Sequence, residues 1–341
     1  MPHNSVQLRS KVIERNASEF SDYQSLLIFG PPINDDLTFL CPKKVITFDY
    51  KVYLSHRASL EALIEFSIDS TEKQKYDSAL VYLPKSKGEL DLALAYITPM
   101  LEKGAGIFLV GEKKAGIASA CKKLDKYGSD NGKIDSAKHC QLWQVSLEIE
   151  PPVFSLDEWL QTYPVSINDI SLEVASIPGV FSFGELDAAT DLLLSNMFSK
   201  LEGRILDFGC GSGVIGCYTK LLNPGIQLEM IDINLLALEC AKRTCELNSI
   251  EAKVYPSDGL AEVTGRVNGL VTNPPFHAGV STEYMTTEGL IRLSKDKMVR
   301  HAPLLLVANN FLRYAHIIEG TFGRCDVLVE NSKFRVYKAY R

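Results

Sequence analysis

The second half of the chain alternates short apolar segments with segments of helical period, and this alternation most restricts how the chain can fold. Helical patterns run from Gly213 to about Leu222 and from Leu235 to Asn248, between apolar runs. The connection between two parallel strands is right-handed and usually contains a helix. We therefore expect an α/β fold with a doubly wound, mostly parallel sheet. The expected strands are 204–209, 226–232, 252–257, 269–273, 304–309 and 334–340.

The first half repeats this rhythm. Its apolar runs lie at 25–30, 45–49, 78–84, 106–111 and 142–148, and Asp49 and Leu83 align with Asp232 and Asn273. The first copy reads "GPPINDD" where the second reads "GCGSG". The pattern indicates an ancient duplication, with two tandem Rossmann-like domains of which the N-terminal copy is degenerate.

A length of 341 residues exceeds what one hydrophobic core normally supports. The Pro-Pro pair in the stretch 149–166 marks a boundary near the midpoint. We predict domains at 1–160 and 161–341. Since only the second copy keeps the residues suited to chemistry, we expect it to be the catalytic one.

The composition is that of an ordinary globular protein, with 46% hydrophobic and 23% charged residues. No apolar run approaches the roughly 18 residues that span a bilayer, and the N-terminus has no apolar core of a secretory signal. We expect a cytoplasmic protein with no membrane partner. The eight cysteines form no C-x-x-C pair, so neither a zinc site nor a disulfide framework is predicted, and no metal is expected.

The net charge of −6 argues against a nucleic-acid partner, but the charge is unevenly distributed. Residues 292–341 carry ten Lys and Arg against four acids, and residues 113–138 carry seven lysines against three acids. Local basic patches determine the attraction for phosphates. The alternative interpretation of each patch is a solvated surface.

The segment "RILDFGCGSGVIG", 204–216, predicts a strand that runs through a glycine loop into a helix. Gly209, Gly211 and Gly213 allow positive φ and close approach to a ligand at the carboxyl edge of the sheet. The loop satisfies the dinucleotide fingerprint and also the D-x-G-x-G-x-G pattern of S-adenosylmethionine (SAM) methyltransferases. Asp207 would repel a pyrophosphate but attract the ammonium and sulfonium of SAM. The sequence therefore favours SAM as the cofactor.

Further candidate cofactor contacts follow the next two strands. Asp232 ends the second strand, where a carboxylate can accept both ribose hydroxyls, although it could instead cap the following helix. Ile233 can pack on the adenine. Asp258 and Gly259 follow the third strand, where the carboxylate suits the adenine amino group, although Asp-Gly is also a common turn.

The segment "NPPF", 273–276, ends the fourth strand abruptly, because Pro274 and Pro275 cannot donate to a ladder. The Asn273 side-chain oxygen and the Pro274 carbonyl are two rigidly held acceptors, which match the two hydrogens of an –NH₂ group. Phe276 can stack on the flat ring that carries the amine. We predict Asn273, Pro274 and Phe276 as catalytic residues, with His277 in a secondary role.

These motifs together resemble class I methyltransferases that modify exocyclic or amide nitrogens. The segments "PGVFSFGELDAATDLLL", "NPPFHAG", "VANNFLRY" and "FRVYKAY" are similar, more narrowly, to the ribosomal RNA small subunit methyltransferase C family. "LPKSKGE", "VGEKKAGIASA" and "DSAKHC" are similar to that family's N-terminal half, so the resemblance covers nearly the whole chain.

The resemblance implies methylation of N2 of a specific guanine in 16S ribosomal RNA of the small ribosomal subunit. We expect the protein to be a monomer. It also implies an N-terminal copy that has lost SAM binding and serves folding and RNA recognition, and a segment around Gly179, Phe181 and Ser182 that covers SAM. The chain departs from the family in having "MVRHAP" where a Gly-Gly turn precedes the "VAN" strand. That departure leaves the conformation of this turn open.

Other functions compete with this one. The sister family that acts on a guanine N2 of 23S RNA shares the architecture and the Asn-Pro-Pro-Phe. A protein-glutamine methyltransferase more usually has Tyr at the position of Phe276. A non-catalytic RNA-binding or assembly factor would not need the intact glycine loop, and a dehydrogenase conflicts with Asp207.

Overall fold

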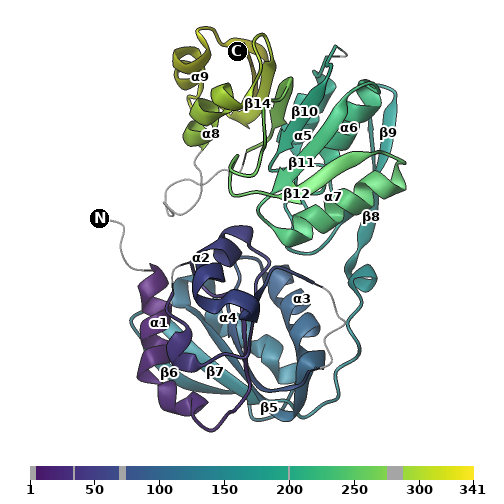
Figure 1. The fold of residues 1–341 in the computed structure, drawn as a ribbon. Coiled ribbons are helices and arrows are strands. Elements are labelled where there is room, and N and C mark those ends of the chain that lie inside the picture. The colour runs from purple at the N-terminus through teal and green to yellow at the C-terminus, as the bar shows by residue number, and fades with distance from the viewer. Residues whose placement is uncertain (1–4, 34, 69–73, 199, 275–286) are drawn as a thin grey trace. The chain divides into compact units, whose positions relative to one another are not determined.

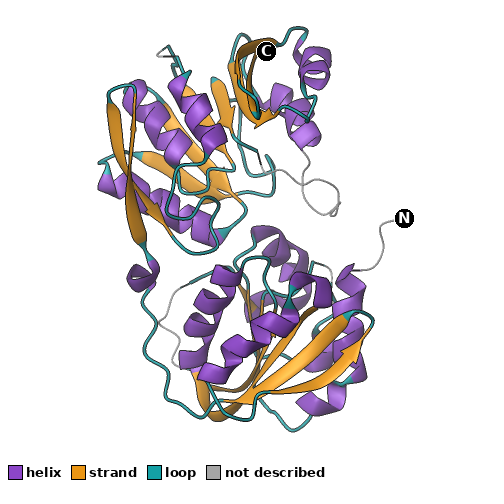
Figure 2. Ribbon diagram, turned by 180° about the vertical axis from the view of Figure 1, so that it is seen from behind, coloured by secondary structure: helices purple, strands orange, loops and turns teal. Residues whose placement is uncertain are grey.

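The computed structural model describes residues 5–33, 35–68, 74–198, 200–274 and 287–341 (Figure 1). The chain divides into two compact units, Met1–Trp159 and Leu160–Arg341, and each is described by itself. In both units a layer of strands lies between helices (Figure 2).

Unit 1 contains a seven-stranded sheet in the order β3-β2-β1-β4-β5-β7-β6. Its pairs are parallel except those made by β7. Its core includes Ile28, Leu80 and Phe108 on neighbouring strands. The strands are β1 (Leu26–Phe29), β2 (Lys44–Ile46), β3 (Ile64–Glu65), β4 (Tyr76–Tyr82), β5 (Leu101–Glu112), β6 (Gly132–Ala137) and β7 (Cys140–Ser146). The α-helices are α1 (Ser5–Arg15), α2 (Tyr50–Leu60), α3 (Lys87–Ile97) and α4 (Ile117–Ala120).

The loop after β1 occupies the place in unit 1 that the glycine loop occupies in unit 2. Pro32 and Ile33 are buried, and the Pro32 carbonyl lies 2.7 Å from Nε2 of His56. Asp35 accepts hydrogen bonds from Ser10 and, at 3.3 Å, from the Tyr82 hydroxyl. The described residues of the loop are therefore packed into the protein and anchored by the Pro32 carbonyl and the Asp35 carboxylate.

Unit 2 repeats the order of unit 1, as β12-β11-β10-β13-β14-β16-β15. Only the pairs made by β16 in this sheet are antiparallel. The strands are β8 (Gln161–Ile167), β9 (Ile170–Ser176), β10 (Arg204–Phe208), β11 (Gln227–Asp232), β12 (Ala252–Pro256), β13 (Gly269–Thr272), β14 (Pro303–Asn309), β15 (Asp326–Glu330) and β16 (Phe334–Tyr340). The α-helices are α5 (Ala188–Ser195), α6 (Val214–Leu222), α7 (Leu235–Leu247), α8 (Thr287–Ser294) and α9 (Ala315–Phe322).

The two faces of the unit 2 sheet carry separate cores, because successive side chains of a strand point to opposite faces. Ile205 packs on the face covered by α5, α6 and the β8–β9 hairpin, and Leu206 packs on the face covered by α8 and α9. The two identical strand orders confirm the predicted α/β class with tandem, doubly wound, mostly parallel sheets.

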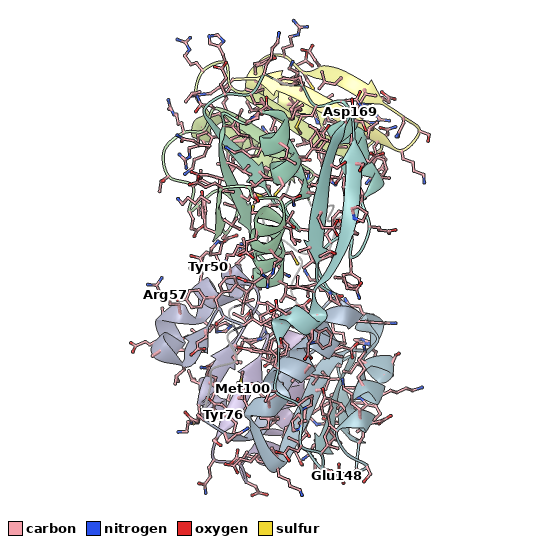
Figure 3. The ribbon with its side chains drawn as sticks, turned by 90° about the vertical axis from the view of Figure 1, so that its right-hand side faces the viewer. Tyr50, Arg57, Tyr76, Met100, Glu148 and Asp169 are labelled. Carbon is pink, nitrogen blue, oxygen red and sulfur yellow. The ribbon has the colours of Figure 1, made fainter. Side chains whose placement is uncertain are left out.

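Five strands escaped the sequence analysis. In unit 1, β3 has only two residues and β6 carries no buried side chain, so neither gives the signal of a central strand. The other three strands lie in unit 2. The hairpin β8–β9 lies outside the main sheet, turns at Asn168 and Asp169, and has Asp169 at its tip (Figure 3). The edge strand β15 carries only half-buried and exposed side chains, so it lacks the apolar signal of a central strand. The segment "MVRHAP", where the sequence departs from the family, turns at His301. His301 has a positive φ of 64° and donates its N–H to the Arg341 carbonyl at 2.7 Å.

Candidate active site

The carboxyl ends of β10, β11 and β13 hold most of the predicted site residues. In the ladder, Asp207 lies opposite Met230 on β11 and Val271 on β13. Thr272 ties the two strand ends together by donating to the Phe208 carbonyl at 2.9 Å. Gly209 and Asn273, the next residues of β10 and β13, therefore leave the sheet side by side.

The glycine loop needs glycine for two different reasons. Gly211 has φ of 53°, and a Cβ there would meet none of the described residues within 4 Å, so these residues leave open space at this point. Gly213 has φ of 79°, and its Cβ would lie 3.1 Å from Cα of Ala241 on α7. Gly213 thus allows the start of α6 to pack on α7, while Gly211 leaves room for a ligand.

Asp232 joins the glycine loop to the end of β11. Its Oδ2 accepts the Gly211 N–H at 2.9 Å, and its Oδ1 accepts the Asn234 N–H at 2.9 Å. The cap of α7 is Asn234, whose side chain accepts from Leu236 and Ala237. The alternative interpretation of Asp232 as a helix cap is therefore wrong, and its carboxylate lies at the rim of the open loop.

Asp207 is fully buried at the end of β10, with its Oδ2 accepting the Gly216 N–H at 2.8 Å. Burial, with a smaller contribution from the Asp232 charge, raises the pKa of Asp207 to about 7. Its Oδ1 has no hydrogen-bond partner in the described part of the chain. A positive charge near this carboxylate would stabilise its ionised form.

Asp258 and Gly259, the predicted adenine contacts after β12, lie on a loop that adjoins Asp232. The Ser257 N–H donates to the Asp232 carbonyl at 3.0 Å. Asp258 and Gly259 follow Ser257 in the chain and so begin close to Asp232. Glu262 holds this loop by accepting the Asp258 N–H at 2.9 Å. Ile233, the residue after Asp232, is half-buried.

The side chain of Asn273 is held by two hydrogen bonds. Its Nδ2 donates to Oδ2 of Asp187 at 3.0 Å and to Oγ1 of Thr190 at 2.9 Å. Its Oδ1 is buried and has no partner among the described residues. Pro274 is buried next to it, whereas Phe276 and His277 lie outside the described residues. The amide is thus held through its nitrogen, and its oxygen is left available.

The sequence analysis missed Asp187 and Thr190. Asp187 caps α5, where its carboxylate accepts the Thr190 N–H at 2.9 Å. An acid followed by an apolar run could have predicted the cap. Nothing in the local sequence indicates the contact with a residue 86 positions away.

The segment between β9 and α5 crosses the carboxyl edge of the sheet. At its start, the Ala175 N–H donates to Thr244 on α7, and at its end Asp187 contacts Asn273 beyond β13. Phe181 lies within this segment and is 61% exposed. Gly179 and Ser182 in the same segment both have positive φ.

Within the described ranges, no three His, Cys, Asp or Glu side chains gather in a way that could hold a metal ion. In those same ranges, no helix has the length and apolar character needed to cross a membrane.

The strand order with one antiparallel strand, the glycine loop and the Asn-Pro exit define a class I methyltransferase fold and site. The Methyltransferase small domain family matches residues 171–338, and the Methyltransferase small domain N-terminal family matches residues 10–163. The chain is therefore a methyltransferase with both of these modules.

Two curated relatives are similar over almost their whole length. Ribosomal RNA small subunit methyltransferase C of Psychromonas ingrahamii is 38% identical, with 96% of this chain and 95% of the relative covered. The protein of the same name from Aeromonas hydrophila is 39% identical, with 96% of each covered. The chain belongs to the ribosomal RNA small subunit methyltransferase C family.

A solved structure has the same two-unit fold. The T. thermophilus 16S rRNA N2 G1207 methyltransferase, solved in complex with AdoMet and guanosine, matches with a TM-score of 0.82. It is 20% identical, and the match covers 93% of this chain and 88% of the other. At this identity the match supports the fold alone.

Proposed function

We propose that this protein transfers a methyl group from SAM to the exocyclic N2 of a specific guanine in 16S ribosomal RNA. The observation that carries the proposal is the buried Oδ1 of Asn273, which has no partner among the described residues. Asn273 follows Thr272, which is bonded to Phe208 directly before the glycine loop. A buried acceptor without a donor is costly, so such a group in a cleft is a good candidate for substrate binding.

The residues present fit SAM. Asp232 provides negative charge beside Gly211, where it would attract a cationic ligand. Asp207 lies buried against the Gly216 N–H, and a cation bound nearby would favour its ionised form. Asp232 would hold the ribose, Ile233, Asp258 and Gly259 the adenine, and the glycine loop the methionine part. Phe181 would cover the cofactor from the crossing segment. SAM supplies an electrophilic methyl group bonded to a positively charged sulfur.

The chain's own part in the reaction is to orient a weak nucleophile. The lone pair of an amine on guanine is delocalised into the ring. Two acceptors, Oδ1 of Asn273 and the Pro274 carbonyl, would bind its two hydrogens and direct the lone pair away from the ring plane. As the nitrogen takes the methyl group and the carbon–sulfur bond breaks, the positive charge would pass from sulfur to nitrogen, where the same two oxygens would stabilise it. The nitrogen would then release one proton to solvent. Phe276 would stack on the guanine.

RNA contacts would come from both units. Phe311 is 71% exposed in the loop after β14, and that loop is held by the Asn310 N–H, which donates to the Lys333 carbonyl at 2.9 Å. An exposed ring on a well-anchored loop suits stacking on a base, with the basic residues of 292–341 bound to phosphates. Unit 1, whose loop after β1 reads "GPPINDD" in place of the glycine motif and which carries the lysines of 113–138, would serve folding and RNA recognition.

The substrate RNA would be part of the small ribosomal subunit, and the protein would act in the cytoplasm. A monomer suffices for the proposed site, because all its residues come from unit 2.

Mapping of methylated nucleotides tests the proposal. Ribosomal RNA from cells lacking the gene should miss one N2-methylguanine in 16S RNA, and expression of the wild-type protein, but not of Asn273→Ala, should restore it. Loss of a methylguanine from 23S RNA would instead establish the sister activity. An unchanged methylation pattern, together with RNA binding by the purified protein, would establish a non-catalytic factor.

A further inference from the structure

We propose that Asp187 and Thr190 are positioning residues for methyl transfer, which fix the orientation of the Asn273 amide. This inference rests on the proposed function and concerns residues that do not themselves touch the substrate. Three contacts define the group: Asn273 Nδ2 to Asp187 at 3.0 Å, Asn273 Nδ2 to Thr190 at 2.9 Å, and Thr190 Oγ1 to Asp187 at 3.3 Å.

The direction of each hydrogen bond follows from chemistry. An ionised carboxylate only accepts, so the Thr190 hydroxyl must use its hydrogen to donate to Asp187. Its lone pairs then remain for Asn273, and both groups facing the amide present acceptors to it. A rotation of the Asn273 amide by half a turn would place its oxygen against those two acceptors. The network therefore selects the rotamer in which the nitrogen faces inward.

The fixed rotamer determines what Oδ1 of Asn273 can bind. With the nitrogen held by α5, Oδ1 is buried and has no partner in the described part of the chain. An Asn side chain free to rotate would present a donor to the guanine amine half of the time, and a donor cannot bind an N–H. Asp187 and Thr190 thus convert an ambiguous side chain into a fixed acceptor.

The substitution Asp187→Asn separates this role from support of the helix. Asn is as good an N-cap as Asp, so α5 should remain folded. The new amide can offer its own NH₂ to Asn273, which removes the preference for one rotamer. We expect kcat for guanine methylation to fall at least about tenfold, a smaller loss than the roughly 10²–10³ for removing a transition-state contact outright. The Kd for SAM should change less than about twofold, because the cofactor contacts remain.

Matched variants complete the kinetic test. Asp191→Asn removes the same charge from the first turn of the same helix, but Asp191 is exposed and contacts Ser195 within α5. It should retain wild-type kcat. Thr190→Val should lower kcat, and Thr190→Ser, which restores the hydroxyl, should recover most of it. Wild-type kcat in Asp187→Asn, or an equal loss in Asp191→Asn, would overturn the inference.

An NMR measurement decides the inference without any substrate. The side-chain amide signals of Asn273, assigned by their absence in Asn273→Ala, should exchange slowly with solvent in the wild type and faster in Asp187→Ala. In the control variant Asp191→Asn, the Asn273 amide should exchange as slowly as in the wild type. Fast exchange in the wild type overturns the inference. If the wild type methylates no ribosomal RNA, the proposed function fails, while the amide measurement still decides whether Asp187 and Thr190 hold Asn273.

Discussion

The N–H of Gly211 donates to Oδ2 of Asp232 at 2.9 Å and so joins the glycine loop after β10 to the end of β11. The contact holds the Asp232 carboxylate at the rim of the loop, where a Cβ on Gly211 would meet nothing within 4 Å in the described part of the chain. Two of the predicted cofactor residues are thereby brought together by one hydrogen bond.

Replacement of Asp232 by Ala should weaken SAM binding. The variant loses a charged acceptor for the ribose, and a hydrogen bond to a charged group is worth about 1.5–3 kcal/mol, or roughly 10- to 100-fold in Kd. Calorimetric titration with SAM measures the change. Glu239→Ala, which removes a half-buried carboxylate of α7 that pairs with Lys242, is the control and should bind as the wild type does. An unchanged Kd in Asp232→Ala would contradict the assignment.

Replacement of Asn273 by Ala should abolish most of the activity and spare the cofactor. Loss of one preorganised polar group that acts in the transition state costs roughly 10²- to 10³-fold in kcat. The Kd for SAM should stay within about twofold of the wild-type value. Single-turnover assays with labelled SAM measure the rate, and calorimetry measures the affinity. Equal losses of both would show that Asn273 supports the cofactor site and not the transfer.

The buried Asp207 should make the free energy of unfolding depend on pH. Its pKa in the folded protein is about 7, whereas an ordinary aspartate titrates at about 3.9. Between these values the folded protein binds more protons than the unfolded chain, so the free energy of unfolding falls as pH rises. Within this window the loss should approach about 1 kcal/mol per pH unit.

Urea unfolding of the wild type and Asp207→Asn at pH 5.5, 6.5 and 7.5 measures this effect. The wild type should lose stability relative to the variant as pH rises. Burial also raises the pKa of Glu89 to about 7, but this contribution is common to both proteins and cancels in the difference. If the difference in the free energy of unfolding between the two proteins is the same at all three pH values, the prediction is wrong.

Replacement of Phe311 by Ala should weaken RNA binding without affecting SAM. Stacking of a base on an aromatic ring is worth about 1–3 kcal/mol, so the Kd for RNA should rise roughly tenfold. The exposed Leu247, at the end of α7, offers a matched control in Leu247→Ala. Filter binding of 16S RNA measures the affinity. If both variants bind RNA as the wild type does, Phe311 is not a stacking platform.

Replacement of His301 by Gly should stabilise the protein. A non-glycine residue in the left-handed region costs about 1 kcal/mol or more, and His301 has a φ of 64°. The exposed His316 lies in α9, where Gly is the poorer residue, so His316→Gly should lower the melting temperature. Calorimetric melting of the two variants measures both effects. A lower melting temperature in His301→Gly would show that the His301 side chain makes a contact worth more than the strain.

The sequence by itself determined the fold class, the repeat and the positions of the glycine loop and of Asn273. These features depend on local properties: the alternation of apolar segments, the backbone freedom of glycine, and the inability of proline to continue a ladder. Such properties act between residues that are close in the chain, and so they can be recognised in the sequence.

Only the tertiary structure decided which partner each polar group meets. It showed that Asn234 caps α7 and leaves Asp232 at the rim of the glycine loop, and that Asp187 holds the amide of Asn273. Both results depend on the packing of separate segments against one sheet edge. A side chain's local sequence limits its conformation, but its hydrogen-bond partner is determined by which distant segment the fold brings within about 3 Å.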